Sequence, residues 1–121
     1  MDQDTYDKGL EIRKRVLREE YVKQSISGAM SFNEDFQALT TEYCCGAVRG
    51  REGLNAGQRS MLNIAMLTAL GRDDELRLHV AGALRNGLTP DEIKEVLLQA
   101  EIYCGIPAVK RISRDIIETH T

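Results

Sequence analysis

Hydrophobic positions recur at the spacing of amphipathic helices along nearly the whole 121-residue chain. No linker, internal repeat or low-complexity tract interrupts this pattern, and neither proline stands where it would bound a strand. We therefore expect one all-α domain, residues 1–121, folded as a compact bundle of six to seven helices. The periodicity places helices at residues 5–19, 20–28, 32–48, 56–70, 73–86, 90–103 and 107–119.

Local start and stop signals support several of these boundaries. Three sites pair an N-cap residue with Glu or Gln three positions later, as in a capping box: Ser31 with Glu34, Asn55 with Gln58, and Thr89 with Glu92. Pro90 follows Thr89 at the first helical position, where a missing N–H group costs nothing. Gly71 and Gly87 each follow an apolar segment, so both are expected to end a helix in the left-handed conformation.

The segment 61–70 is apolar on nearly every face, interrupted only by Asn63 and Thr68. A helix of this kind has to be covered on all sides, and a chain of this length has few elements that could cover it. The pattern therefore predicts a homo-oligomer that buries this helix. The alternative is that it forms the central helix of a monomeric bundle.

The helix expected at 73–86 carries the candidate chemistry. Its apolar stripe is formed by Leu76, Val80, Ala83 and Gly87. Along the flank of this stripe lie Arg72, Glu75, His79 and Asn86. A side chain on a flank can be partly desolvated beside an opposite charge, which is how a histidine or carboxylate acquires a functional pKa. The alternative is an ordinary surface pair of Glu75 and His79 one turn apart.

Composition excludes several classes of partner and cofactor. The formal net charge is −3 without a cluster of Lys or Arg, so neither nucleic acid nor an anionic membrane surface is expected as a partner. No apolar stretch approaches a membrane span and the N-terminus lacks an apolar signal region, so we expect a cytoplasmic protein. Glu75 and His79 supply only two ligands and His120 lies in the C-terminal tail, so no metal is expected.

The three cysteines do not suggest a thiol mechanism. Cys44 and Cys45 are adjacent, where a mutual disulfide would strain the backbone, and neither has a partner at C-x-x-C spacing. Cys104 precedes Gly105-Ile106-Pro107, a helix break, and is expected to be a small buried residue. Reduced thiols in a cytosolic protein are the simpler interpretation.

Five segments together resemble the carboxymuconolactone decarboxylase family, and most closely its γ-carboxymuconolactone decarboxylases of aromatic catabolism. They are F-N-E-D-F-Q (32–37), G-L-N-A-G-Q-R-S-M-L-N-I-A-M-L-T-A-L-G-R (53–72), E-L-R-L-H (75–79), N-G-L-T-P-D-E-I-K-E-V-L-L-Q (86–99) and I-Y-C-G-I-P-A (102–108). Several of these are common in helices, but the order of E-L-R-L-H, N-G-x-T and Y-C-G-x-P-A is specific.

The resemblance implies the all-α alkylhydroperoxidase D-like fold, with protomers assembled into trimeric or hexameric rings. Peroxidase relatives carry C-x-x-C-x-x-x-H where this chain has Arg72, Glu75 and His79. Those relatives also place a Glu at the position of Ser60, 19 residues before His79. Because the redox thiols and this Glu are replaced, thiol peroxidase activity is an alternative that the chain looks unsuited for.

A decarboxylase of this family needs no cofactor. In a γ-carboxylated butenolide the departing carboxylate is vinylogous to the lactone carbonyl, which accepts the electrons released with carbon dioxide. The resemblance implies that Arg72 or Arg59 binds the substrate's carboxylates, since the planar guanidinium suits them. His79 is the candidate general acid, oriented by Glu75, and Ser60 a candidate substrate contact.

The chain departs from the family where W-G-x-x-W-x-R-P-G-L is usual and C-G-A-V-R-G-R-E-G-L stands instead. Cys45 and Arg49 replace tryptophans, and Glu52 replaces the proline. Arg49 and Arg51 could bind an anionic substrate, although they could also be solvated surface charges. A second departure places Lys110 and Ser113 where an amide and an aromatic ring are usual.

These departures leave three further alternatives to γ-carboxymuconolactone decarboxylation. One is a divergent paralogue with an altered pocket that acts on another small acid. The second is a non-catalytic oligomeric protein that binds a small molecule. The third is the thiol peroxidase, and the fold by itself does not select among them.

Overall fold

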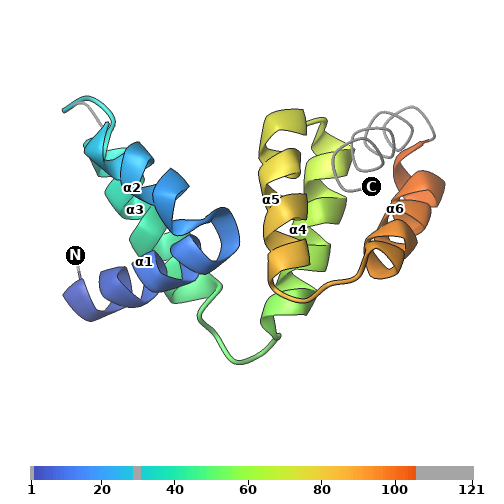
Figure 1. Ribbon diagram of the computed structural model, residues 1–121, viewed down its shortest axis with the longest axis horizontal. Coiled ribbons are helices and arrows are strands. Elements are labelled where there is room, and N and C mark those ends of the chain that lie inside the picture. The colour runs from blue at the N-terminus through green and yellow to red at the C-terminus, as the bar shows by residue number, and fades with distance from the viewer. Residues whose placement is uncertain (1, 29–30, 106–121) are drawn as a thin grey trace. The chain divides into compact units, whose positions relative to one another are not determined.

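The computed structural model describes residues 2–28 and 31–105. Within these ranges the chain forms six α-helices, one π-helix and no strand, which confirms the all-α class (Figure 1). The helices are α1 (Gln3–Leu17), α2 (Glu19–Ser27), α3 (Glu34–Leu39), η1 (Thr40–Val48), α4 (Ala56–Leu70), α5 (Asp73–Arg85) and α6 (Pro90–Cys104). The helix predicted at 107–119 and residues Lys110, Ser113 and His120 lie outside the described residues.

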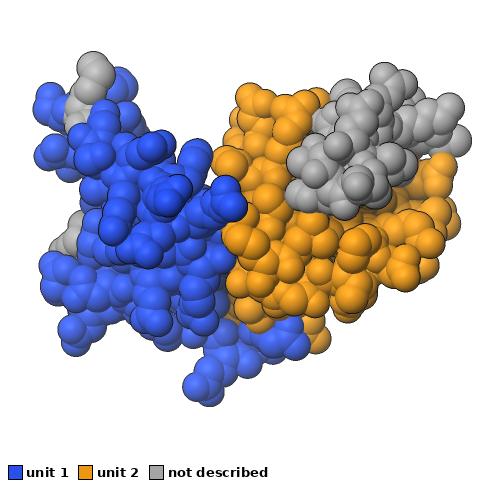
Figure 2. Space-filling view, in the orientation of Figure 1, with its two compact units in different colours: residues 1–55 blue, residues 56–121 orange. Residues whose placement is uncertain are grey.

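The described chain divides into two compact units, residues 1–55 and 56–121 (Figure 2). Unit 1 contains α1, α2, α3 and η1, and unit 2 contains α4, α5 and α6. Each unit is described below by itself, and the expectation of a single domain stays a prediction. None of the helices at residues 2–28 and 31–105 is long and apolar enough to cross a membrane.

Unit 1 is organised by close backbone packing of α1 against η1. A Cβ atom at Gly9 of α1 would overlap the Thr41 carbonyl oxygen and lie 2.7 Å from the Gly46 amide nitrogen. A Cβ atom at Gly46 would in turn overlap the Thr5 carbonyl oxygen. Glycine is therefore required at this crossing because no side-chain atom fits between the two backbones.

The helix predicted at residues 32–48 is wrong in its form. The α-helix begins only at Glu34, and after Leu39 the chain continues as the π-helix η1. The Thr41 hydroxyl donates to the Gln37 carbonyl oxygen at 2.9 Å, and such back-bonding perturbs regular α-helical geometry. Because the contacts that hold Thr41 come from α1, local periodicity could not predict this change.

The Ser31 capping box is also wrong. Asn33 is the N-cap of α3, and no side-chain hydrogen bond caps this helix. Residues 31–33 form a turn, so Ser31 lies two residues before the N-cap. It is therefore not at the position from which a side chain caps the first backbone N–H groups of the helix. The Thr89–Glu92 box is confirmed, with Glu92 N bonded to Thr89 Oγ1 at 3.1 Å and Thr89 N to Glu92 Oε1 at 2.9 Å. The Asn55–Gln58 box stays a prediction.

Replacing Thr89 by alanine is expected to lower the free energy of unfolding by about 1 kcal/mol, since it removes a side-chain cap. Ser31→Ala is the matched control, because Ser31 belongs to a similar sequence pattern but caps no helix. We expect Ser31→Ala to change stability by less than about 0.5 kcal/mol. Urea denaturation followed by circular dichroism measures both variants, and equal losses would contradict the assigned caps.

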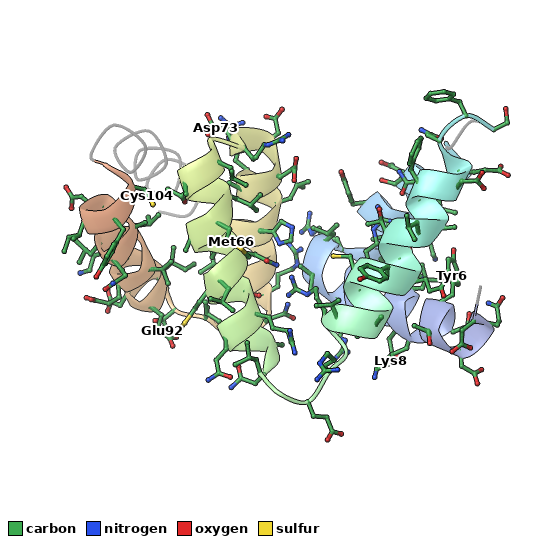
Figure 3. All side chains as sticks on the ribbon, turned by 180° about the vertical axis from the view of Figure 1, so that it is seen from behind. Tyr6, Lys8, Met66, Asp73, Glu92 and Cys104 are labelled. Atoms are coloured by element: carbon green, nitrogen blue, oxygen red, sulfur yellow. The ribbon has the colours of Figure 1, made fainter. Side chains whose placement is uncertain are left out.

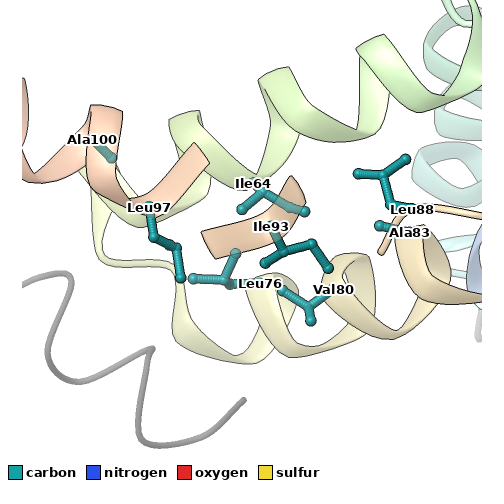
Figure 4. Packing of buried hydrophobic residues seen from close by; sticks show 8 residues of the cluster. All are labelled: Ile64, Leu76, Val80, Ala83, Leu88, Ile93, Leu97 and Ala100. Carbon is teal, nitrogen blue, oxygen red and sulfur yellow. The ribbon is translucent and has the colours of Figure 1, made fainter. Parts of the chain in front are cut away.

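Unit 2 is built on the antiparallel pair α4 and α5, with α6 packed against α4. The two turns use glycines at positive φ, Gly71 at 70° and Gly87 at 100°, as the sequence predicted. The buried cluster in Figure 4 joins all three helices and the loop before α6. Its members are Ile64, Leu76, Val80, Ala83, Leu88, Ile93, Leu97 and Ala100.

The predicted apolar stripe of α5 is confirmed at Leu76, Val80 and Ala83 but not at Gly87. Gly87 is exposed because the helix ends at Arg85 and the chain turns there. Leu88 is buried in its place, so the stripe continues through the loop into the core. A pattern based on unbroken helical periodicity misses this change because the periodicity ends with the helix.

Candidate functional site

His79 lies in the middle of α5, at the margin of the unit 2 core. Its neighbours one turn away on the helix, Leu76 and Ala83, are fully buried. His79 itself is half-buried, and its ring atom Nδ1 is shielded from solvent. A partly desolvated imidazole with one open side is suited to hold a proton and deliver it to a bound molecule.

The predicted row of Arg72, Glu75 and His79 is only partly brought together. The side chains of Arg72 and Glu75 are exposed, whereas that of His79 is half-buried at the edge of the core. Arg72 is the N-cap residue of α5 and not part of the helix. Its amide N donates to the Leu67 carbonyl at 3.0 Å, which fixes its backbone at the tip of the hairpin. Arg72 and Glu75 therefore present charges to solvent beside the end of α5.

The helix α4 places Arg59 and Ser60 on the same hairpin. Ser60 is buried, with 1% exposed surface, so it belongs to the interior of unit 2. Arg59 is half-buried, and its Nε atom is shielded from solvent. A half-buried guanidinium keeps its charge and can therefore bind a carboxylate strongly.

Counting from the turn places these residues along the hairpin. Gly71 and Arg72 form the turn, and Ile64 lies as far before it as His79 lies after it. Ile64 and His79 are therefore at about the same height along the axis of the hairpin. At a rise of about 1.5 Å per residue, Arg59 lies about 7.5 Å from that level in one direction. Arg72 lies about 10 Å from it in the other direction. The two guanidinium-bearing residues therefore bracket His79 along the hairpin axis.

The other predicted binding residues belong to unit 1. Arg49 is the C-cap residue of η1 and is half-buried, with its Nη1 atom shielded from solvent. Arg51 and Glu52 are exposed, and Cys45 is buried. Since one guanidinium nitrogen of Arg49 is buried, the alternative that Arg49 is a fully solvated surface charge is wrong.

One feature of unit 1 was missed from the sequence. Arg13 is buried and donates to Thr41 Oγ1 at 3.1 Å and to Gln37 Oε1 at 2.9 Å. The spacing of Gly9, Arg13 and Val16 already places this arginine on the buried stripe of α1. In unit 2 the prediction of a buried Cys104 is wrong, because this thiol is exposed at the last residue of α6.

The described residues hold no group of three or more His, Cys, Asp and Glu side chains arranged to bind a metal ion. The predicted site residues on the α4–α5 hairpin instead carry two guanidinium groups (Arg59 and Arg72), one carboxylate (Glu75) and one imidazole (His79). This set can bind anionic groups and transfer a proton.

Comparison with known proteins gives concordant matches. The model of the carboxymuconolactone decarboxylase family matches residues 34–114. The chain is 44% identical over 107 residues to 4-carboxymuconolactone decarboxylase of Acinetobacter baylyi, covering 88% of this chain and 80% of that protein. It is 41% identical over 103 residues to nitrosuccinic acid decarboxylase npaB of Metarhizium robertsii, covering 85% and 72%.

A third relative is an uncharacterized 15.0 kDa protein from the nqo9-nqo10 intergenic region of Paracoccus denitrificans. It is 37% identical over 68 residues, which cover 54% of this chain and 51% of that protein. Its name carries no activity, so the two decarboxylases are the informative relatives.

Proposed function

Since the chain belongs to the carboxymuconolactone decarboxylase family and is a carboxy-lyase, we propose a substrate for it. The proposed substrate is γ-carboxymuconolactone, or a related small anionic lactone, which the protein decarboxylates in aromatic catabolism. The product is the enol-lactone and the reaction uses no cofactor. The family match runs from residue 34 to residue 114, through both compact units, which supports treating them as one decarboxylase domain.

The position of His79 carries this proposal. Loss of carbon dioxide leaves an electron pair that flows through the double bond into the lactone carbonyl, forming an oxyfuran-like dienolate. The reaction is completed when a proton is delivered to the ring carbon, and a half-buried imidazole at the core margin is a suitable donor. His79 then regains its proton from water.

Arg59 and Arg72 are proposed to bind the substrate's carboxylates. They lie on either side of His79 along the hairpin, which is the arrangement that an acid with two separated anionic groups would need. Arg59 is the stronger candidate, because partial burial strengthens its interaction with a carboxylate, whereas Arg72 is exposed. Glu75, one turn before His79, is proposed to orient the ring.

Three further residues are proposed substrate contacts with weaker support. Ser60 is adjacent to Arg59 but buried, so it would act on the substrate only from the interior of unit 2. Arg49 and Arg51 add positive charge near the segment where family members carry tryptophan. These arginines would attract an anionic substrate through their field even without direct contact.

A second candidate substrate is another small acid with an electron-accepting group next to the departing carboxylate. The 41% identity to nitrosuccinic acid decarboxylase favours it, because a nitro group can accept the electrons that the lactone carbonyl accepts in the first candidate. The presence of Cys45, Arg49 and Glu52 in place of two tryptophans and a proline also favours a changed substrate.

We also propose that the protein acts as a homo-oligomer, a trimer or a hexamer. On α4, Leu62, Met66 and Leu70 follow each other at four-residue spacing, and Met66 and Leu70 are 53% and 70% exposed. Figure 3 labels Met66 on this helix. A second exposed apolar row runs along α3 and η1 through Phe36, Leu39 and Tyr43. Rows of exposed apolar side chains are typical of a face that another protomer covers.

The substrate assignment is tested by carbon dioxide release from enzymatically generated γ-carboxymuconolactone and, in parallel, from nitrosuccinate. We expect turnover of the lactone, whereas turnover of nitrosuccinate alone would favour the second candidate. Absence of release from either acid by folded protein would contradict the proposed substrate class. Peroxide consumption that ends when Cys104 is alkylated would be required to support the thiol peroxidase alternative.

The same assay tests the role of Arg59. Arg59→Ala is expected to raise KM by about tenfold or more, since a charge-assisted hydrogen bond to the substrate is lost. Arg77→Ala is the matched control, because Arg77 is exposed and paired with Asp74 at 3.0 Å on the surface of α5. An unchanged KM in Arg59→Ala would remove Arg59 from the proposed binding site.

A further inference from the structure

Arg13 is the only charged residue among the buried side chains of the described residues. It lies on the inner face of α1 with 7% of its surface exposed, and its partner Thr41 on η1 is fully buried. Burial removes most of the hydration of a guanidinium, and proteins normally compensate this loss with a negative charge. An anion beside Arg13 would therefore stabilise unit 1.

The hydrogen bonds of Arg13 within the described residues all go to uncharged oxygens. Its Nη1 atom donates to Thr41 Oγ1 at 3.1 Å, and its Nη2 atom donates to Gln37 Oε1 at 2.9 Å. The Thr41 hydroxyl donates in turn to the Gln37 carbonyl oxygen at 2.9 Å, which fixes the two acceptors relative to each other. Neutral partners of this kind compensate only part of the hydration that a buried charge loses.

The acidic side chains of unit 1 do not supply the counter-charge. At residues 2–28 and 31–55, no carboxylate forms an ion pair with Arg13, whereas Glu19 pairs with Lys23 at 2.9 Å. Glu42 of η1 accepts a hydrogen bond from the Asp2 amide at 3.2 Å. The other acidic residues of the three α-helices in this unit are exposed, and they are Asp4, Asp7, Glu11, Glu20, Glu34 and Asp35.

Three of the five N–H groups of Arg13 remain for a ligand. The two hydrogen bonds use one N–H group of each Nη atom, which leaves one on each Nη atom and the Nε–H group. In the part of the chain that the structure describes, Nε donates no hydrogen bond, yet it does not belong to the buried nitrogens without a partner. Nε therefore borders solvent, and the edge formed by Nε and an Nη atom suits a carboxylate.

We propose that Arg13 binds a small monovalent carboxylate in unit 1, with Gln37 and Thr41 as positioning groups. The carboxylate accepts two parallel hydrogen bonds from the open edge of the guanidinium, while the two positioning residues hold the Nη atoms on the other side. The small exposed fraction of Arg13 limits the ligand to compact anions. This site is on α1, α3 and η1, so the inference is independent of the decarboxylation proposed at α4 and α5.

The direct test is saturation-transfer NMR of formate, whose single C–H proton reports binding to the full-length protein. A ligand of three non-hydrogen atoms binds with about millimolar affinity at best, so formate is used at about 10 mM. The comparison buffer has the same ionic strength and contains a bulky sulfonate in place of formate. We expect saturation transfer to formate, and its absence in the folded parent protein would overturn the proposal.

Formate bound at the α4–α5 hairpin is distinguished by variants. The signal is expected to persist in the Arg59→Ala, Arg72→Ala double variant and to be lost in Arg13→Met, which keeps a long side chain without charge. Arg15→Met is the matched control, because Arg15 is exposed near the end of the same helix. A formate signal that survives in folded Arg13→Met, or disappears in the double variant, would place the anion elsewhere and overturn the proposal.

A further variant supplies the counter-charge within the chain. Gln37→Glu places a carboxylate oxygen where Gln37 Oε1 lies 2.9 Å from Arg13 Nη2. We expect the unfolding equilibrium constant to fall about tenfold and the formate signal to fall about fivefold or more, since the guanidinium is then neutralised. Gln99→Glu, at an exposed position of α6, makes the same change in net charge and should alter neither quantity.

The stability of the parent protein gives a readout that requires no variant to fold. Formate at about ten times its Kd is expected to lower the unfolding equilibrium constant about tenfold relative to the sulfonate buffer, by mass action. In Gln37→Glu the same addition should have less than about a twofold effect. Equal stabilities of Gln37→Glu and Gln99→Glu, or an equal response of both to formate, would show that Arg13 lacks no counter-charge and would overturn the proposal.

Discussion

Replacement of His79 by alanine is expected to lower kcat for decarboxylation by about 10²–10⁴-fold, the usual contribution of a positioned general acid. His79 is half-buried between Leu76 and Ala83, with Nδ1 shielded, and alanine at this position leaves no side chain that can donate the proton. The measurement is carbon dioxide release under saturating substrate. Because the ring lies at the core margin and not inside it, the variant should fold.

Two controls separate proton transfer from structure. His79→Gln keeps a polar side chain of similar length but cannot donate a proton as an acid, so it should lose activity nearly as fully as alanine. Lys94→Ala removes an exposed side chain of α6, paired with Asp91 at 3.8 Å, and should leave kcat unchanged. If His79→Gln retained more than about a third of the parent kcat, the acid role would be wrong.

Substitution of Gly9 by alanine is expected to destabilise the protein by about 3 kcal/mol or more, the upper range for overpacking. The added Cβ would overlap the Thr41 carbonyl oxygen, a backbone atom that a rotamer change cannot move away. The backbones of α1 and η1 would have to separate, which also disturbs the buried Arg13–Thr41 hydrogen bond. Urea denaturation followed by circular dichroism at 222 nm measures the loss.

Gly53→Ala is the matched control for this experiment. A Cβ atom at Gly53 would have no neighbour within 4 Å, and its φ lies outside the positive range that disfavours alanine. This variant is expected to change the free energy of unfolding by less than about 0.5 kcal/mol. Similar stabilities of Gly9→Ala and Gly53→Ala would show that α1 and η1 do not pack as closely as the structure describes.

Local signals predicted unit 2 better than unit 1. The bounds predicted for α4, α5 and α6 differ from the structure by no more than one residue. Their starts and stops are set by groups close in sequence, such as the Thr89 hydroxyl and the glycines at positive φ. In unit 1 the change from α3 to η1 depends on packing against α1, so the same reasoning failed there.

The candidate site was predicted in its residues but not in its environment. The spacing of Glu75 and His79 indicated a shared flank, and the family resemblance added Arg59 and Ser60. Periodicity could not show that Ser60 is buried while Arg72 is exposed, because exposure depends on which neighbouring helix covers each flank. The hydrogen bond from Arg13 to Thr41 could not be predicted for the same reason, since these residues lie on different helices.

The sequence by itself determined the all-α class, the family, most helix boundaries and the position of His79 on its helix. These properties follow from periodicity, capping groups and motifs, which depend only on residues that are close together in the sequence. The tertiary structure alone decided the π-helix and the burial of Arg13. Each of these depends on contacts between helices, where a backbone or a charge from a distant segment changes the local geometry and the local electrostatics.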